Sequence, residues 1–321
     1  MTNTAPTTSP ETDSATSPPA IPKRRLMLVH AHPDDETTST GTTMARYAAE
    51  GAGVTLVTCT LGELGEVVIP ELEHLRHDND DNLAPRRLEE LTKAMQELGV
   101  TDFVRLGGDG RWRDSGMAYD ERGGAIAPDE VHDGSFWRAD LLEAANELVS
   151  LIRDRRPQVL ITYDEKGHYG HPDHVQAHRV ATYAAALAGV ASYRPELGEP
   201  WQIQRVLWTA MSAETFREMI RAGREAGESN EWFDSIDLDS DEPPMMTVRD
   251  RDIDVRIDGY AYGAQRFAAM RAHATQIRND EFFFKLQDAP PGRLWEECFR
   301  LASGVPLPDG ADDLFAGLTL D

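Results

Sequence analysis

Short apolar runs and amphipathic stretches alternate along most of the chain. Five runs have the length and the β-branched or aliphatic content of strands, at residues 25–30, 54–60, 102–107, 159–164 and 205–211. The stretches between them repeat apolar residues at helical spacing, as at Leu88, Leu91, Met95 and Leu98. This spacing predicts helices over residues 38–50, 84–99, 135–156 and 172–187.

The boundaries of these helices follow from a few local residues. Gly51 and Gly99 are expected to end the first two helices, because glycine readily adopts the left-handed conformation found there. Ser135 is expected to cap the third helix, and Pro157 to stop it. Strands that alternate with helices predict an α/β fold with a mostly parallel sheet and helices on both faces.

The two ends of the chain differ from this regular pattern. Residues 1–23 are rich in Thr, Ser and Pro and are expected to form a disordered tail. Residues 24–212 carry the alternating pattern. In residues 213–321 the pattern predicts an α+β portion that packs on the sheet and completes a pocket without being an independent domain. Its expected elements are a helix at 213–226, a strand at 247–257 and a helix at 259–273.

Composition and charge narrow the class of partner. The chain has 321 residues, of which 40% are hydrophobic, and its formal net charge is −24. The electrostatic field of a protein with this net negative charge repels nucleic acid and anionic membranes. No apolar run in the sequence is long enough to span a bilayer. A neutral or weakly charged small-molecule substrate is the easier fit, and the oligomeric state stays open. Residues 1–23 do not have the pattern of a secretory signal, and Cys59 and Cys298 suit a reduced compartment better than a disulfide framework, so we expect a cytoplasmic protein.

The segment "HAHPDDE" places ionisable side chains directly after the first predicted strand. In open parallel sheets, ligands bind beyond the carboxyl ends of the strands. His32 and Asp35 are three residues apart, which suits one imidazole and one carboxylate facing a divalent ion. Asp34 is then free to accept a proton from the water activated at the metal. The alternative is that the acids only cap the following helix, which we favour for Glu36.

A second segment, "GHYGHPDH", follows the strand at residues 159–164 and repeats the His-Pro-Asp sequence. If both segments lie at the same edge of the sheet, His171 or His174 can supply the third ligand. Two histidines and one carboxylate leave a position for water and substrate, as in hydrolytic zinc sites. The same set also suits Fe(II), and ligand counting leaves both metals open. His168 is more typical of an exposed loop histidine, and His273 is ambiguous.

These motifs resemble the PIG-L/LmbE-like superfamily of zinc deacetylases. The resemblance begins with "AHPDDE" and "HPDH" and extends to "TCTLGELGEV", "GRWRDSGM" and "MRAHATQI", so that it covers nearly everything after residue 23. The last three stretches resemble the branch that acts in actinobacterial mycothiol biosynthesis. The resemblance implies a Rossmann-like fold and one Zn²⁺ per chain, with Fe²⁺ as the other possibility. It implies hydrolysis of the acetamide of 1-D-myo-inositol 2-acetamido-2-deoxy-α-D-glucopyranoside to the free amine and acetate.

The resemblance also implies a role for particular side chains. The implied metal ligands are His32, Asp35 and His174, and the implied general base is Asp34. Around the oxyanion and the leaving amine, the implied groups are His171, a mobile Tyr169, and Asp173, which orients His171. Arg87 and Asp114 match positions that contact hydroxyl groups of the sugar or inositol. From the residues alone, we would interpret Arg87 as a solvated helix residue, and Asp114 could equally be a turn residue.

One departure from the family pattern and two alternative functions accompany this interpretation. Members of the branch commonly have Gly-Gly before the second motif, whereas this chain has Gly167 and His168, which puts the flexibility of that loop in doubt. The nearest alternative function is mycothiol S-conjugate amidase, whose pattern has Pro where this chain has Gly170 and a Lys shortly after "HPDDE" that is missing here. The alternative from another class is a non-catalytic sugar-binding module with a structural metal, which the extra carboxylate of Asp34 argues against.

Overall fold

The computed structural model describes residues 21–320 except 122, 226, 228–233 and 281. Seven strands form one sheet in the order β3-β2-β1-β6-β7-β9-β8. The parallel part consists of β1 (Arg25–His30), β2 (Gly53–Thr58), β3 (Asp102–Arg105), β6 (Val159–Thr162) and β7 (Arg205–Ala210). The predicted α/β fold with a mostly parallel sheet is therefore confirmed. The expected tail at residues 1–23 lies almost wholly outside the described residues.

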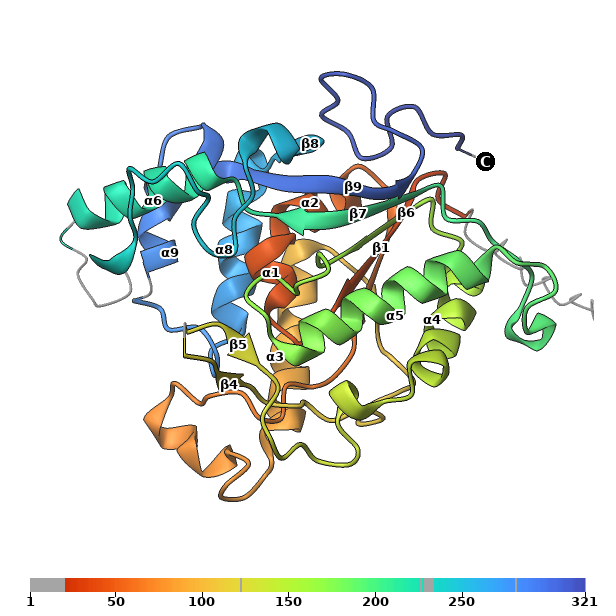
Figure 1. Ribbon diagram of the computed structural model, residues 1–321, viewed down its shortest axis with the longest axis horizontal. Coiled ribbons are helices and arrows are strands. Elements are labelled where there is room, and N and C mark those ends of the chain that lie inside the picture. Colours follow the sequence, from red (N-terminus) through yellow and green to blue (C-terminus); the bar gives the residue numbers. More distant parts are fainter. Residues whose placement is uncertain (1–20, 122, 226, 228–233, 281, 321) are drawn as a thin grey trace, which may run out of the picture.

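Helices cover both faces of the sheet (Figure 1). One face carries α4 (Leu141–Arg155) and α5 (Pro172–Ala188), and the other carries α2 (Gly41–Ala49), α3 (Leu83–Leu98) and α8 (Gly263–Ala272). Because side chains alternate along a strand, β1 serves both layers: Met27 and Val29 belong to the core under α4 and α5, whereas Leu26 and Leu28 belong to the core under α2, α3 and α8. Burial on both faces explains why this strand reads as a continuous apolar run.

The remaining strands come from the C-terminal part of the chain. The long strand β9 (Glu296–Gly304) pairs antiparallel with β7, and β8 (Val255–Asp258) pairs antiparallel with β9. The C-terminal residues thus extend the same sheet. Strand β9 was not predicted, because its sequence "EECFRLASG" mixes charged and apolar residues and lacks the apolar run of the parallel strands. The predicted strand at residues 247–257 is also wrong in extent, since a 3₁₀ turn occupies Asp250–Asp252.

Several predicted helix boundaries need correction. The helix expected at residues 38–50 is two helices, α1 (Asp35–Ser39) and α2, because Thr40 between them has an extended φ of −141°. The cap expected at Ser135 belongs to Asp140, whose carboxylate accepts from the amide of Glu143 at 2.9 Å. Gly99 ends α3 in the left-handed conformation, as predicted.

The order of the strands explains where a site can form. Strands β1 and β6 are neighbours, with Leu26 opposite Val159. The chain leaves β1 toward β2 on one side and leaves β6 toward β7 on the other, so the sheet has a switch point between β1 and β6. The loops that follow these two strands therefore meet at one crevice. Both sequence motifs lie in these loops.

No helix in the described residues is long and apolar enough to cross a membrane.

Candidate metal centre and active site

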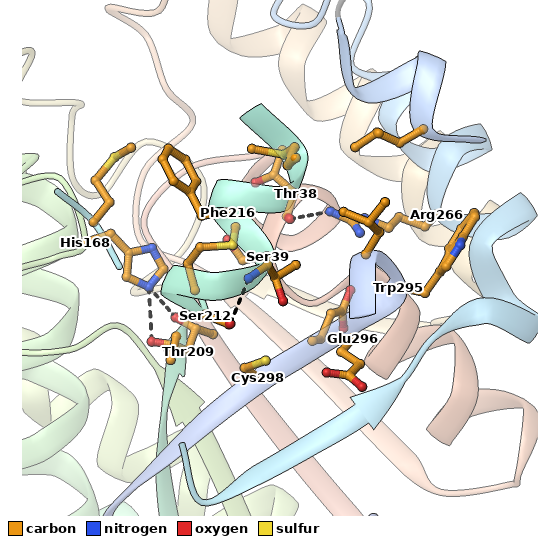
Figure 2. Close-up of a pocket in the computed structure, with 18 of the residues that line it drawn as sticks. Thr38, Ser39, His168, Thr209, Ser212, Phe216, Arg266, Trp295, Glu296 and Cys298 are labelled. Carbon is orange, nitrogen blue, oxygen red and sulfur yellow. Dashed lines mark hydrogen bonds between the residues drawn. The ribbon is translucent and has the colours of Figure 1, made fainter. Parts of the chain in front are cut away.

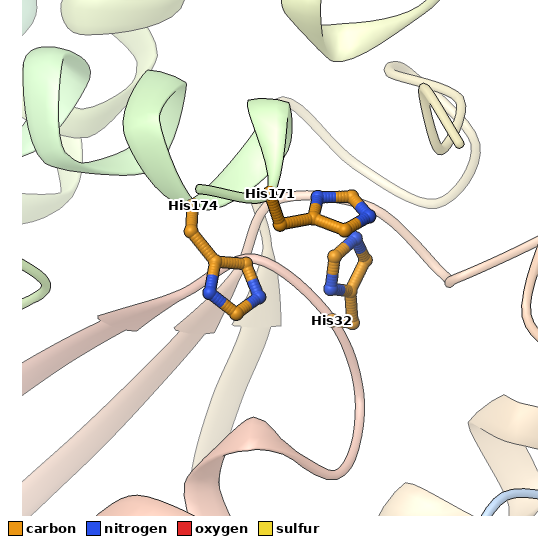
Figure 3. Close-up of side chains that lie close together, drawn as sticks. All are labelled: His32, His171 and His174. Carbon is orange, nitrogen blue, oxygen red and sulfur yellow. The ribbon is translucent and has the colours of Figure 1, made fainter. Parts of the chain in front are cut away.

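The histidines of the two motifs lie side by side beyond the carboxyl ends of β1 and β6. His32 follows β1, whereas His171 is the N-cap of α5 and His174 lies in its first turn. The ring centroids are 4.6 Å apart for His32 and His171, 5.3 Å for His32 and His174, and 5.1 Å for His171 and His174. Figure 3 shows the three imidazoles coming together from the β1 loop and α5. All three are buried, and together they could hold a metal ion.

The carboxylate of Asp35 lies between two of these histidines. Its Oδ2 is 3.3 Å from Nδ1 of His32, and its Oδ1 is 3.3 Å from Nε2 of His174. Two ligands about 2.0–2.1 Å from one tetrahedral zinc ion lie roughly 3.3 Å apart, so each of these two distances suits a shared ion, with a different oxygen of Asp35 facing each histidine. The hydroxyl of Tyr163 and the amide of His32 each donate to Oδ2 at 2.8 Å and fix the orientation of the carboxylate.

The surroundings of these side chains also fit a cation. Both ring nitrogens of His174 are buried without a hydrogen-bond partner among the described residues, since the approach to Asp35 lacks hydrogen-bond geometry. Buried polar atoms without a hydrogen-bond partner are rare, and they are typical of side chains that bind an ion. Burial by itself lowers the pKa of His32, but Asp114, Asp173 and Asp35 outweigh it and raise the pKa well above its ordinary value. A cation would offset this concentration of negative charge.

A second group that could hold an ion comprises His32, Asp114, His171 and Asp173. Its geometry is better explained as support for the first group. Nε2 of His32 is 3.3 Å from Oδ2 of Asp173, on the other side of the ring from Asp35. The Asp173 carboxylate also accepts from the amide of Ser115 at 2.9 Å and from its hydroxyl. A metal-binding histidine commonly donates its second ring N–H to such a carboxylate.

The sequence predicts that Asp173 orients His171, and the structure places these groups differently. The carboxylate of Asp173 contacts His32 and Ser115. The contact with His171 is made by the backbone, because the amide of Asp173 donates to Nδ1 of His171 at 3.1 Å. A ring that accepts at Nδ1 carries its proton on Nε2 when it is neutral. Burial and the neighbouring His32 and His174 lower the pKa of His171 to about 2, so the ring is neutral near pH 7.

Asp34 lies in the turn between His32 and Asp35 with an unusual backbone. Its φ and ψ are 120° and −31°, a region that residues other than glycine rarely adopt. Its side chain is 23% exposed, and its Oδ2 accepts from the Arg87 guanidinium at 2.8 Å. Burial raises the pKa of Asp34 to about 6 against the opposing effect of Arg87. A carboxyl group with such a pKa is ionised near neutral pH and can accept a proton.

The two positions matched to substrate binding both lie at the crevice. Arg87 comes from α3 and is 2% exposed, so the alternative of a solvated helix residue is wrong. It donates to the carbonyl oxygens of Gly62 and Pro33 as well as to Asp34. Asp114 is buried and accepts from the amide of Gly116 at 2.8 Å, as a turn-forming aspartate does. Its Oδ1 is also 3.9 Å from Nε2 of His32.

Tyr169 and the preceding His168 lie beside the histidines of the second motif. The Tyr169 ring packs edge-on against His174 at 5.0 Å and against His171 at 6.1 Å. His168 has a left-handed φ of 62° and is half-buried, with Nε2 at 2.6 Å from Oγ1 of Thr209, so it is not a free loop side chain. It therefore ties the second motif to β7, where a glycine would leave the turn untied.

The same two residues also border an apolar cavity of about 210 Å³ (Figure 2). The cavity lies between α1, α6 (Ala213–Glu225), α8, β7 and β9. Its wall is rich in sulfur-containing and aromatic side chains, namely Met211, Met219, Met246, Met270, Cys298, Phe216, Phe267 and Trp295.

Sequence reasoning did not single out three further groups at the site. Tyr163 directly follows β6, and its hydroxyl accepts from the amide of Ala31 at 2.8 Å while it donates to Asp35. Ser115 lies in the quoted "GRWRDSGM" stretch and holds Asp173. The third group is a buried pair of Glu36 and His273 behind Asp34. Only Tyr163 had a usable signal, because a polar residue at the carboxyl end of a buried strand points to the crevice.

The fold and the site together define an α/β protein whose candidate metal centre lies at the switch point of a parallel sheet. The family model for PIG-L, described as GlcNAc-PI de-N-acetylase, matches residues 27–185. The chain belongs to this family. It is 55% identical over 302 residues to the 1D-myo-inositol 2-acetamido-2-deoxy-alpha-D-glucopyranoside deacetylase of Kribbella flavida, covering 93% of this chain and 99% of that protein. The relatives are deacetylases, so the chain is an enzyme of the hydrolase class rather than a binding module.

Solved structures support the fold over nearly the same length. N,N'-diacetylchitobiose deacetylase from Pyrococcus horikoshii is similar with a TM-score of 0.55 at 15% identity, over 87% of this chain and 83% of that one. The 4-carboxy-2-hydroxymuconate hydratase GalB from Pseudomonas putida is similar with a TM-score of 0.58 at 17% identity, over 90% of this chain and 100% of that one. A hydratase and a deacetylase on one fold show that the chemistry must be argued from the site.

Proposed function

We propose that this enzyme hydrolyses the acetamide of 1-D-myo-inositol 2-acetamido-2-deoxy-α-D-glucopyranoside to the free amine and acetate, as a step in mycothiol biosynthesis. The observation that carries the proposal is the position of the Asp35 carboxylate between His32 and His174, with Asp34 beside it. This arrangement occurs in a chain that is 55% identical to a deacetylase named for that substrate. Both cysteines are free and buried, which suits the reduced cytoplasm that we propose as its compartment.

We assign one Zn²⁺ per chain to His32, Asp35 and His174, and Fe²⁺ suits the same donors. When bound, such an ion polarises the amide carbonyl and lowers the pKa of a water from 15.7 to about 7. The chain supplies the orientation of the ligands. Asp173 holds His32 from behind, and Tyr163 holds Asp35.

Asp34 is the proposed general base. Asp35 faces the two histidines, and the neighbouring carboxylate of Asp34 does not. The Asp34 pKa of about 6 suits proton transfer near neutral pH. Arg87 holds the carboxylate through a 2.8 Å hydrogen bond and keeps it ionised. The proton that Asp34 accepts from water is then available for the departing amine.

His171 and Tyr169 are proposed to face the oxygen of the tetrahedral intermediate. Because the pKa of His171 is low, we assign it as a neutral Nε2–H donor. A neutral donor stabilises a developing oxyanion without proton transfer, and removal of one such donor typically costs about 2.7–4 kcal/mol in the transition state. Tyr169 lies close enough to His171 and His174 to add its hydroxyl.

Arg87 and Asp114 are proposed to bind the polyol. Gly62, Pro33 and Asp34 use three of the five N–H groups of the Arg87 guanidinium, so it has donor capacity beyond its bonds to the protein. The carboxylate of Asp114 can accept hydrogen bonds from hydroxyl groups of the sugar or inositol. Direct contact of Arg87 with both Asp34 and the substrate would couple recognition to the position of the base.

A second candidate is amide cleavage in a larger, thiol-conjugated substrate, as in mycothiol S-conjugate amidase. The observation that favours it is the apolar cavity beside Tyr169 and His168, which could receive an apolar group. The deacetylase is preferred because Gly170 and the absence of a Lys after "HPDDE" match its pattern.

The experiment compares release of primary amine by the zinc-loaded protein from the inositol-linked N-acetylglucosamine and from a mycothiol conjugate. The proposal predicts a higher kcat/KM for the acetylated sugar. Faster turnover of the conjugate would replace the deacetylase with the amidase.

A further inference from the structure

Directly behind Asp34 lies a fully buried pair formed by Glu36 and His273. Both side chains are 0% exposed, and Nε2 of His273 is 2.6 Å from Oε1 of Glu36. The two residues are 237 positions apart in the chain. Glu36 lies in α1, and His273 directly follows the last residue of α8. The second oxygen of Glu36, Oε2, accepts from the backbone amide of Asp34 at 2.8 Å. The pair therefore links the C-terminal part of the chain to the backbone of Asp34.

The backbone of Asp34 needs such a link. Its φ of 120° is strained for a residue other than glycine, and such a conformation persists only where the surroundings hold it. The carbonyl of Asp34 is held by the amide of Thr37 at 3.0 Å, and its carboxylate by Arg87 at 2.8 Å. For the amide, the hydrogen bond that the structure gives is the one to Glu36.

The position of Glu36 depends in turn on His273. A buried carboxylate without a partner is strongly unfavourable, so Glu36 requires a donor on its second oxygen. Nδ1 of His273 is buried without a partner among the described residues, which leaves Nε2–H as the ring's contribution to hydrogen bonding. The backbone at His273 is itself fixed, because its carbonyl oxygen accepts from the amides of Gln276 and Ile277 at 3.0 and 2.9 Å.

We propose that Glu36 and His273 are positioning residues for Asp34, and that they hold its strained backbone so that its carboxylate stays directed at the reacting water. This inference rests on the proposed function, because it takes Asp34 as the base. Neither residue touches the proposed ligands His32, Asp35 and His174 through a hydrogen bond or ion pair that the structure gives. The pair would therefore act on the rate of the chemical step rather than on metal binding.

The alternative is that the pair only stabilises the fold. A control variant in the same segment distinguishes a positioning role from a role in the stability of the fold. The amide and hydroxyl of Thr275 donate to Glu90 at 3.1 and 2.6 Å, and both residues are buried. This pair resembles the Glu36–His273 pair in its burial and in its large separation along the chain. Within the part of the chain that the structure describes, no hydrogen bond connects it to Asp34. Thr275→Val removes the buried bond of the hydroxyl and is the matched control.

The experiment measures amine release, zinc content and hydrogen exchange of the Asp34 amide in the full-length zinc-loaded wild type, His273→Ala, His273→Gln and Thr275→Val. For His273→Ala we expect kcat to fall about 10- to 100-fold, as for a catalytic group displaced by about 1 Å, with KM and zinc content within threefold of wild type. His273→Gln keeps a donor toward Glu36, and we expect it to regain at least half of the loss in log kcat. Thr275→Val should change kcat less than twofold.

Two further readouts decide whether the effect passes through Asp34. In the Asp34→Ala background, His273→Ala should have no additional effect on residual amine release. Exchange of the Asp34 amide should speed up at least tenfold in His273→Ala but not in Thr275→Val. An unchanged kcat in folded His273→Ala, or a full loss that persists in the Asp34→Ala background, would overturn the inference. If the wild type releases no amine, the proposed function fails, and unaltered exchange at Asp34 would still refute the positioning role by itself.

Discussion

The hydroxyl of Tyr163 donates a 2.8 Å hydrogen bond to Oδ2 of Asp35 and accepts another from the amide of Ala31 at 2.8 Å. It thus joins β6 to the turn that follows β1. Its ring also stacks on His174 with centroids 4.2 Å apart. One tyrosine therefore contacts two of the three proposed metal ligands.

Tyr163→Phe removes this hydroxyl and keeps the stacked ring. Groups that orient metal ligands typically contribute 10–100-fold to metal affinity, so we expect the zinc dissociation constant to rise by about that factor. The unpaired amide of Ala31 should lower the free energy of unfolding by about 1–3 kcal/mol. Competition with a chromogenic chelator measures the affinity. Tyr183→Phe is the control, because Tyr183 lies on α5 and is 49% exposed; an equal loss of affinity there would contradict the role of Tyr163.

Asp34→Ala separates the base from the ligands. Because Asp35 rather than Asp34 lies between the two histidines, we expect zinc content to stay near one ion per chain. Loss of a general base should lower kcat about 10²–10⁴-fold. His174→Ala is the counterpart, and it should lose the metal itself. Loss of zinc from the Asp34 variant would make Asp34 a ligand, and full zinc content in the His174 variant would remove His174 from the metal.

Much of this fold follows from sequence because the parallel strands are buried on both faces, and β1 and β6 therefore appear as apolar runs. The antiparallel strand β9 could not be predicted in this way, because it contains the buried charged residue Glu297. Glu297 accepts hydrogen bonds from the amides of Thr42 and Thr43, which are far away in the sequence. In the site, too, only part of the arrangement could be predicted from local sequence. The motif residues His32, Asp35 and His174 come together as the motifs predict, while their roles remain predictions.

The partners behind the motifs were beyond sequence reasoning. His273 was ambiguous because its partner Glu36 lies 237 residues away. Arg86 and Arg87 are adjacent in sequence and look alike there. The structure distinguishes them, because Arg87 lies on the buried side of α3 and is 2% exposed.

Gly170 tests the turn that carries Tyr169 and His171. Its φ is 100°, and a Cβ would lie 2.4 Å from the carbonyl oxygen of Ala125. We expect Gly170→Ala to lower the free energy of unfolding by about 2–4 kcal/mol and to reduce kcat, because the turn must shift. Gly108→Ala is the matched control: Gly108 has the same φ of 100° but open space around it, so this variant should show the conformational cost alone. Equal effects in thermal unfolding and turnover would exclude the clash with Ala125.

Acid stability should depend on Asp102 at the edge of the sheet. Burial raises the pKa of Asp102, but the hydrogen bonds from Arg155 and Thr55 outweigh it and hold the pKa below its ordinary value of 3.8. The contribution of a carboxyl group with a lowered pKa is present above the unfolded-state pKa and is lost as the pH falls through the folded-state pKa. Asp102→Asn should therefore destabilise the protein at pH 6 and have little effect near pH 2. Urea unfolding at both pH values measures this, and an equal effect at both would show that the charge does not matter.

The central claim is that hydrolysis depends on one ion held by His32, Asp35 and His174. The most direct measurement is amine release from the inositol-linked N-acetylglucosamine as zinc is added back to chelator-treated protein. The account predicts no release above the blank without metal, and a linear rise that ends at one zinc per chain. Full turnover by the metal-free protein would contradict it.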